Sequence, residues 1–168
     1  MTTVVADTSA LVSFGVVAGH DPSPLDVLLN KYTALTASEV IAELHTTASY
    51  AGDHGRVAGA VLDRRDRIDV RDVDLDTAFP LDGGENAAVT LANEVGAAMF
   101  LCDEFDELAI VHASLVGCRL VTTPKLIAVL VRKHLLAEDE ATAALNRMRD
   151  VRSWTNNSYA QRARETFE

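Results

Sequence analysis

The 168-residue chain has few lysines, few aromatic residues and almost no cysteine. It contains 3 lysines beside 12 arginines, and aromatic residues make up 5% of it. Its 2 cysteines, Cys102 and Cys118, form no CxxC pair and have no histidine at ligand spacing. Since their neighbours are apolar, we expect buried free thiols in a reducing compartment rather than a disulfide or a zinc site.

Long apolar runs are also missing. The longest one near the C-terminus covers residues 126–131, whereas a membrane span needs roughly 18 apolar residues. The opening residues, MTTVVADTSA, contain neither a basic segment nor a long apolar one, so the sequence predicts no signal peptide. We therefore expect a cytoplasmic protein with no membrane partner.

What the chain does contain is apolar residues, at 48%, together with a large excess of acid. The apolar fraction excludes intrinsic disorder, and the length suits one compact domain. The 25 acidic residues against 15 basic ones give a net charge of -10, which ordinarily counts against a nucleic-acid partner. Two explanations stand: the acids belong to a functional site, or they form a halophilic-like acidic surface that keeps the protein soluble in a salt-rich cytoplasm.

Short apolar segments alternate with segments of helical period along the chain. This alternation predicts an α/β fold with a mostly parallel sheet. The predicted strands are residues 3–6, 32–36, 68–73 (an edge strand), 98–102 and 119–122, and the predicted helices are residues 39–44, 56–67, 85–95, 104–115, a stretch from 124, and 138–149. From residue 151 the chain is polar without a clear period, so we expect a domain of residues 1–150 and a partly disordered, arginine-bearing C-terminal tail of residues 151–168.

Several carboxylates occupy strand ends and helix starts. Asp7 directly follows the first strand and Asp103 the most apolar one; ligands of open parallel sheets bind beyond these carboxyl ends. Glu43 lies on a helix, Glu85 opens another helix after two glycines, and Asp106 lies one turn beyond Asp103. Converging carboxylates need a cation, and an all-oxygen site favours Mg²⁺ or Mn²⁺ over zinc. Such a site suits hydrolysis of a phosphodiester.

Each acid also has a purely structural interpretation. Asp7 can cap the helix that follows it, and Glu85 can interact favourably with a helix dipole. Glu43 can be a solvated helix residue, and Glu104 and Asp106 fit surface charges, with Asp106 the better placed of the two for a site. The joint order and spacing of the acids, rather than any single residue, indicate the metal site.

Four segments in this order resemble the motifs of the PIN domain, the nuclease fold of VapC-type toxins and related ribonucleases. They are VVADTSAL (residues 4–11), SEVIAEL (38–44), GENAAVTLA (84–92) and LCDE (101–104), and GCRLVTT (117–123) resembles the strand that follows them. The resemblance covers about residues 4–135. It implies a PIN-like three-layer α/β/α sandwich around a central, mostly parallel sheet.

The resemblance further implies a metal-dependent endoribonuclease that uses Mg²⁺ or Mn²⁺ and acts on RNA. Homodimers and a cognate antitoxin protein are common in the family, so both are expected partners. The implied catalytic and metal-binding residues are Asp7, Glu43, Glu85 and Asp103, with Asp106 as a further metal ligand. The hydroxyls expected to orient a metal-bound water or a phosphate oxygen, unless they are ordinary caps, are those of Thr8, Ser9 and Thr123.

Two positions depart from the family pattern, and both affect substrate positioning more than metal binding. The arginine that commonly follows the fourth motif has no counterpart at Leu108 and Ala109, and Thr122 replaces a glycine. Other families that begin with this aspartate fit less well, because a haloacid-dehalogenase-type site needs an acid where Ser9 stands, and a DxSxS site needs a hydroxyl where Leu11 stands. Besides a toxin, a non-toxin RNA-processing nuclease and an inactive PIN-like RNA-binding or protein-interaction module remain open.

The C-terminal residues differ in charge from the rest. Residues 146–168 carry five arginines against three acids, so this stretch has a net charge of +2. Trp154 and Tyr159 lie within it, and arginine with aromatic residues suits single-stranded RNA. An amphipathic segment that packs on the domain or on a dimer mate is the alternative interpretation.

Overall fold

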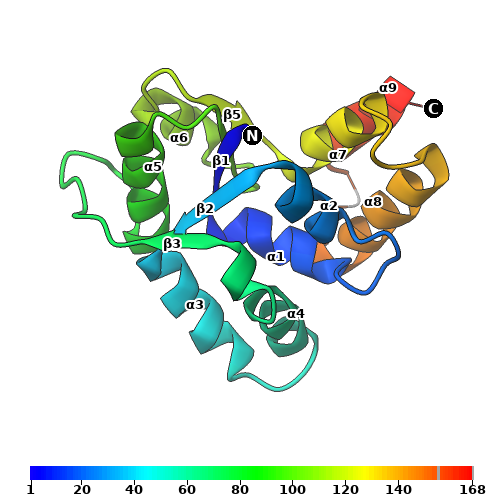
Figure 1. Cartoon of the computed structure of the whole chain (residues 1–168), viewed down its shortest axis with the longest axis horizontal. Coiled ribbons are helices and arrows are strands. Elements are labelled where there is room, and N and C mark those ends of the chain that lie inside the picture. Colours follow the sequence, from blue (N-terminus) through cyan, green and yellow to red (C-terminus); the bar gives the residue numbers. More distant parts are fainter. Residues whose placement is uncertain (155, 168) are drawn as a thin grey trace.

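Five short parallel strands form the central sheet of the protein (Figure 1). The computed structural model describes residues 1–154 and 156–167. The spatial order of the strands is β3-β2-β1-β4-β5. They are β1 (Thr3–Ala6), β2 (Thr33–Ala37), β3 (Asp69–Arg71), β4 (Met99–Leu101) and β5 (Arg119–Val121). The predicted α/β fold is confirmed, and every pairing in the sheet is parallel.

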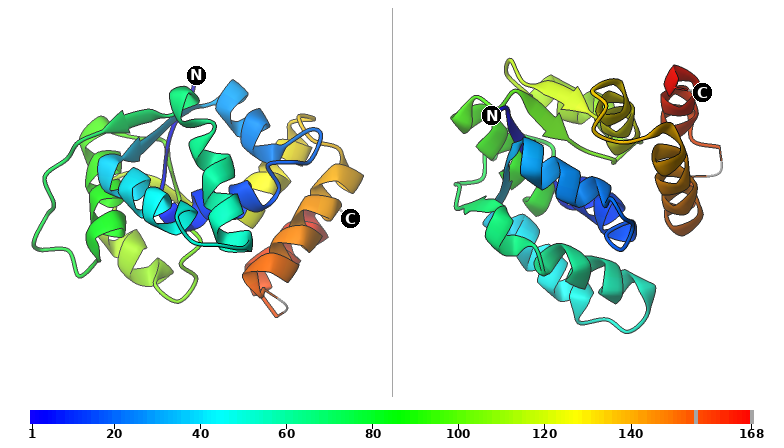
Figure 2. Two further views of the ribbon diagram at one scale, coloured as in Figure 1. Left: turned by 90° about the horizontal axis from the view of Figure 1, so that it is seen from below. Right: turned by 45° about the vertical axis from the view of Figure 1, so that its right-hand side comes forward.

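Helices cover both faces of this sheet. They are α1 (Thr8–Val16), α2 (Pro24–Lys31), α3 (Ser38–Ala48), α4 (Asp53–Leu62), α5 (Gly83–Val95), α6 (Leu108–Ser114), α7 (Thr123–Arg132), α8 (Glu138–Arg152) and α9 (Ser158–Phe167), with a short 3-10 helix at Arg65–Arg67. Helices α5 and α6 lie on one side and α1, α2 and α7 on the other, while α8 and α9 lie together beyond α7 (Figures 1 and 2). These three layers are the expected sandwich.

Composition explains which strands are central. Val4, Val5 and Phe100 are fully buried, as strands covered on both faces require. The edge strand β3 instead alternates exposed Asp69 and Arg71 around a half-buried valine, and the two charged side chains pair at 2.7 Å. The prediction of an edge strand here is therefore confirmed.

The order of the strands reverses beside β1. The chain steps from β1 to β2 and β3 on one side and then returns to place β4 and β5 on the other. At such a switch point the two connections leave in opposite directions and open a crevice beyond the carboxyl ends of the strands. Asp7 and Asp103, which follow β1 and β4, stand at this crevice.

Local capping explains where the predicted helices differ from the observed ones. The prediction missed α2, which Ser23 caps through its hydroxyl and which begins with proline, both of which are helix-start signals. The predicted helix at residues 56–67 begins earlier, at Asp53, and its end is a 3-10 turn. Helix α3 has no side-chain cap, because its N-cap residue is Ala37. Ser38, the first helical residue, donates its hydroxyl hydrogen to the Arg71 carbonyl of β3.

The expectation of a partly disordered tail is wrong for the described residues of the C-terminus. Residues 158–167 form α9, which packs on α7 and α8 and buries Ala160, Ala163 and Phe167. Trp154 is also buried. Packing on the domain, the alternative interpretation, is what the structure has. The division at residue 150, which falls inside α8, stays a prediction.

Both cysteines are buried and unbonded, as predicted. Burial raises the pKa of the Cys102 thiol well above its ordinary value, so this group stays protonated. Within residues 1–154 and 156–167, no helix has both the length and the apolar character needed to cross a membrane.

Candidate metal centre

Two aspartates form the buried floor of the crevice at the switch point. Their strands are neighbours, with Ala6 of β1 paired to Leu101 of β4, so the two acids emerge at the same edge. Asp7 is 1% exposed and Asp103 is 4% exposed. Carboxylates are seldom buried this deeply unless they are paired or bind a metal.

One oxygen of Asp7 is fully used within the fold. Oδ1 accepts hydrogen bonds from the Ser9 hydroxyl at 2.7 Å and from the Ala10 amide at 2.9 Å, so Asp7 is the N-cap of α1. The other oxygen, Oδ2, is buried and has no hydrogen-bond partner among the described residues. The capping interpretation is therefore right for Oδ1, whereas Oδ2 is available to a ligand.

Asp103 repeats this division. Its Oδ1 accepts a hydrogen bond from the Thr123 amide at the start of α7, at 2.7 Å, while Oδ2 is buried without a partner in the part of the chain that the structure describes. The Thr123 hydroxyl is likewise buried and unpartnered there. Three unsatisfied oxygens at one edge of the sheet are costly, and a bound cation with its water would satisfy them.

Ser9 joins the two aspartates. Its hydroxyl donates to Asp7 and accepts from the Asp103 amide at 2.8 Å. Because Ser9 is only 6% exposed, it holds the two strand ends in register rather than facing solvent. The hydroxyl of Ser9 thus contacts both acids, and its predicted role in binding substrate stays a prediction.

Burial shifts the titration of both aspartates upward. It raises the pKa of Asp7 from 3.8 to about 7, against the lowering effect of the Ala10 and Ser9 hydrogen bonds. It also raises the pKa of Asp103, against the lowering effect of the hydrogen bond from the Thr123 amide. The negative charge of Asp103 further raises the pKa of Asp7. Without a cation, this pair therefore retains a proton near neutral pH, whereas a bound cation would allow both to ionise.

Glu43 reaches the same crevice from α3. It is exposed, and its Oε2 accepts a hydrogen bond from the Thr8 hydroxyl at the start of α1. Its carboxylate lies against the backbone of Gly84, where a Cβ atom would collide with Oε1. Gly84 thus leaves the space that Glu43 occupies at the start of α5. Thr8 thus donates a hydrogen bond to an acid of the crevice, and its predicted role as a substrate ligand stays a prediction.

Glu85 stands beside Gly84 in the first turn of α5, where Asp82 caps the helix. Burial, the carboxyl of Glu107 and the nearby charges raise the pKa of Glu85. One ligand oxygen from each of Glu85, Glu104 and Glu107 lies within 4.8 Å of the others. These three side chains form the acidic cluster, in which Glu104 and Glu107 are exposed. The charge of Asp7 contributes to the raised pKa of Glu85, and that of Asp103 to the raised pKa of Glu104, so the cluster lies near the two aspartates.

The loop after β4 therefore contributes other acids than the sequence indicated. Asp106 is exposed and lies outside the cluster, although it lines a cavity of about 440 Å³ together with Asp103 and Glu104. Glu104 was predicted to be a surface charge and is exposed, yet it also contributes an oxygen to this cluster. Glu107, also exposed, was not among the predicted site residues. Their only sequence signal is that both lie in the short connection that must cross the carboxyl edge of the sheet.

The C-terminal segment closes the other side of this cavity. Ser153 and Trp154 line it, and the Trp154 ring meets the Phe105 ring edge-on with centroids 5.2 Å apart. Burial raises the pKa of both Asp103 and Glu104, and the positive charge of Arg152 partly offsets this rise, so this cation lies near the acids. The site thus contains one arginine from the segment that the sequence pattern predicted to be a tail.

Comparison with known proteins agrees with this geometry. A family model described as DUF3368, PIN domain, matches residues 3–168. The fold is similar to a chain in the crystal structure of VapBC2 from Rickettsia felis bound to a DNA fragment from their promoter, with a TM-score of 0.51 and 14% identity. The aligned part covers 72% of this chain and 98% of that chain. At this identity the likeness concerns the fold alone. No curated protein matches the chain significantly.

Proposed function

The chain belongs to the PIN domain family, and we propose that it is a metal-dependent endoribonuclease of the VapC toxin type. The observation that carries the proposal is the pair of buried aspartates, each with one oxygen fixed by the fold and one without a partner among the described residues. A structural role accounts for the fixed oxygens only. A divalent cation accounts for the other two.

Asp7 and Asp103 would hold the metal ion, with Glu43 and the cluster around Glu85 within the same crevice. The residues fit Mg²⁺ or Mn²⁺ because the donor set is entirely oxygen. When bound, such an ion supplies hydroxide at neutral pH and neutralises charge on the leaving oxygen of a phosphodiester. Asp106 remains a candidate for an additional ligand from the cavity wall.

The chain's own residues prepare this site in three ways. Ser9 and the Thr123 amide fix the rotation of the two aspartates, so their remaining oxygens are held in place before any ligand arrives. Burial and the nearby Glu107 carboxyl raise the pKa of Glu85 to about 9, so Glu85 holds a proton at neutral pH when no cation is bound. The buried Thr123 hydroxyl would donate to a water or a phosphate oxygen beside Asp103.

Cleavage of single-stranded RNA in the presence of Mg²⁺ or Mn²⁺, and its loss with a chelator, would test the activity. Asp7→Asn keeps the size of the side chain and should abolish both cleavage and the calorimetric signal of Mn²⁺ binding. Cleavage that survives both the chelator and this substitution would show that the proposed mechanism is wrong. An intact protein that binds no cation would instead favour an inactive interaction module.

The toxin role rests on the family and on the fold shared with a VapBC2 complex. An antitoxin protein and a second copy of this chain are therefore the proposed partners, and the cytoplasm, which also suits the two free thiols, is the proposed location. Expression of the wild-type chain should arrest growth, and the Asp7→Asn chain should not. If the wild-type chain cleaves RNA but leaves growth unaffected, a non-toxin RNA-processing nuclease is the better description.

A further inference from the structure

A second cavity, of about 290 Å³, lies on the outer side of β5 between α7 and α9. Its lining includes two cationic side chains, Lys125 and Arg162, and two hydroxyls, Thr122 and Thr166. Among the residues that the structure describes, no acidic one lines it. In a chain with a net charge of -10, a hollow whose charged lining is cationic is a distinct electrostatic feature.

The two cations are available to a ligand. Both are exposed, and neither takes part in an ion pair between residues that the structure describes. The Arg162 guanidinium lies over the Tyr159 ring, 5.9 Å from its centroid, which limits the positions it adopts. The Thr122 side chain accepts a hydrogen bond from the Lys125 amide and retains its own hydrogen for a ligand.

Two structural links place this cavity next to the metal centre. Thr122 lines the cavity, and the next residue, Thr123, donates its amide hydrogen to Asp103. On the other wall, the ring of Tyr159 stacks on that of Phe105 with centroids 5.1 Å apart, and Phe105 lines the cavity that contains Asp103. The stacked rings of Tyr159 and Phe105 thus join the lining of one cavity to that of the other.

We propose that this cavity binds a backbone phosphate of single-stranded RNA, beside the phosphate that is cleaved at the metal centre. Lys125 and Arg162 would pair with the phosphate oxygens, and the Thr122 hydroxyl would donate to one of them. This inference rests on the proposed nuclease function and assigns a substrate position to the C-terminal helix.

The interaction should be independent of base identity. Phe105 covers one face of the Tyr159 ring and the Arg162 guanidinium lies over the ring as well, so this ring offers a base little open surface on which to stack. Phosphate contacts position a strand without reading its sequence. The cavity therefore contributes affinity and register, and the base preference of the enzyme has to arise elsewhere.

The double variant Lys125→Gln/Arg162→Gln tests this role, with Lys31→Gln/Arg65→Gln as a control of equal charge change. The control residues precede β2 and β3, at the opposite edge of the sheet. For an RNA oligonucleotide, the test variant should raise KM about tenfold and leave kcat within about twofold. The slope of log affinity against log salt should decrease by about 0.7 for each phosphate that the variant no longer binds. Mn²⁺ binding should not change.

The outcomes separate this inference from the function on which it depends. If wild-type protein cleaves RNA but the test variant matches the control in KM and salt slope, the phosphate subsite is wrong. A variant that changes KM for only some base sequences overturns it as well, since a phosphate contact acts on all of them. If wild-type protein cleaves no RNA at all, the proposed function itself fails.

Discussion

Aspartates at two places in the molecule have opposite titration behaviour. Asp26 on α2 accepts hydrogen bonds from Arg64 and Arg67, and these contacts lower its pKa. Asp7 and Asp103 are buried and form no ion pair among the residues that the structure describes, and burial raises the pKa of each. The first arrangement stabilises the fold, whereas the second costs stability until a positive charge arrives. Acids of the second kind point to a function.

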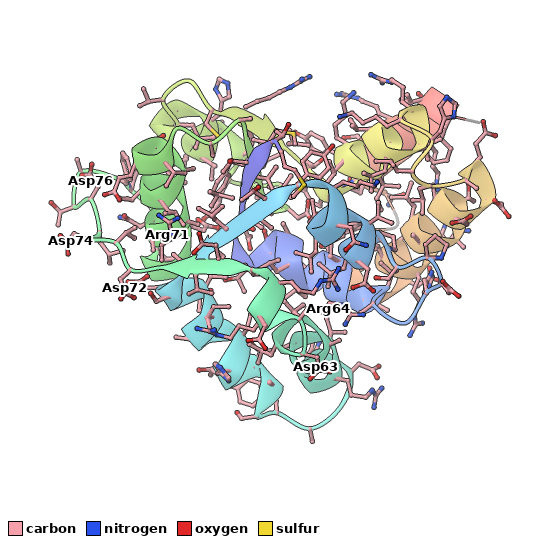
Figure 3. All side chains as sticks on the ribbon, in the orientation of Figure 1. Asp63, Arg64, Arg71, Asp72, Asp74 and Asp76 are labelled. Atoms are coloured by element: carbon pink, nitrogen blue, oxygen red, sulfur yellow. The ribbon has the colours of Figure 1, made fainter. Side chains whose placement is uncertain are left out.

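Other exposed acids form a third group, which takes part in no ion pair between residues that the structure describes. Asp72, Asp74 and Asp76 lie on the exposed loop after β3, at the margin of the molecule (Figure 3). Asp63, at the end of α4, is also exposed. The net charge of -10 therefore combines solvated acids, paired acids and the acids of the crevice, so it does not by itself exclude RNA.

The largest expected effect is on activity. Asp103→Asn removes the charge but keeps the acceptor for the Thr123 amide, so the fold should persist while metal-dependent cleavage falls by at least about a hundredfold. Cleavage rates and Mn²⁺ calorimetry measure this. An unchanged rate would show that the buried aspartates are not the functional pair.

The metal-free protein should become less stable as pH rises, because of the raised pKa of Asp7. Folding raises the pKa of this acid from 3.8 to about 7, so the folded state binds more protons between these values. The free energy of unfolding should therefore decrease by a few kcal/mol as pH rises from about 4 to about 7, and then level off. Urea unfolding with a chelator present measures it, and Asp7→Asn should remove that part of the slope.

Asp26 should behave in the reverse way. Its pKa is lowered by Arg64 and Arg67, so its stabilising effect is present at neutral pH and is lost as pH falls through the lowered value. Asp26→Asn should cost about 1 kcal/mol at pH 7, because the pair is partly exposed to water. RNA cleavage should stay as in the wild type. If the folded Asp26→Asn variant lost activity, the distinction between a structural Asp26 and the functional pair Asp7 and Asp103 would be wrong.

The smallest effect is expected at Gly84. A Cβ here would collide with Oε1 of Glu43, so Gly84→Ala should displace this flexible carboxylate and reduce cleavage several-fold. Gly83→Ala is the matched control, because a Cβ at Gly83 meets no atom within 4 Å. Equal cleavage rates for the two variants would indicate that the position of Glu43 does not matter to the reaction.

The strands predicted from local sequence patterns were confirmed where the pattern of apolar and charged residues depends directly on burial. The apolar segments ending at Asp7 and at Asp103 identified the two central strands, since a strand covered on both faces must be apolar throughout. The same spacing placed the two acids at one sheet edge. The alternating charges of Asp69 and Arg71 identified the edge strand in the same way.

Other features depend on contacts between distant residues. The tail has a low apolar content, yet α9 is ordered because Phe167 and two alanines find a surface on α7 and α8. Glu107 joins the acidic cluster only because the loop after β4 turns toward α5. Neither contact can be predicted from the spacing of apolar residues within one segment.

The sequence by itself determined the α/β class, the order of the acids along the chain and the two aspartates at the strand ends, because these follow from hydrophobic period and from chain order. Only the tertiary structure decided which oxygen of each aspartate is satisfied, which glutamates accompany them, and that a cationic cavity lies beside them. These features depend on which side chains from separate elements come together at the edge of the sheet. The burial of a side chain and the charges around it are set by these long-range contacts and cannot be read from any one segment.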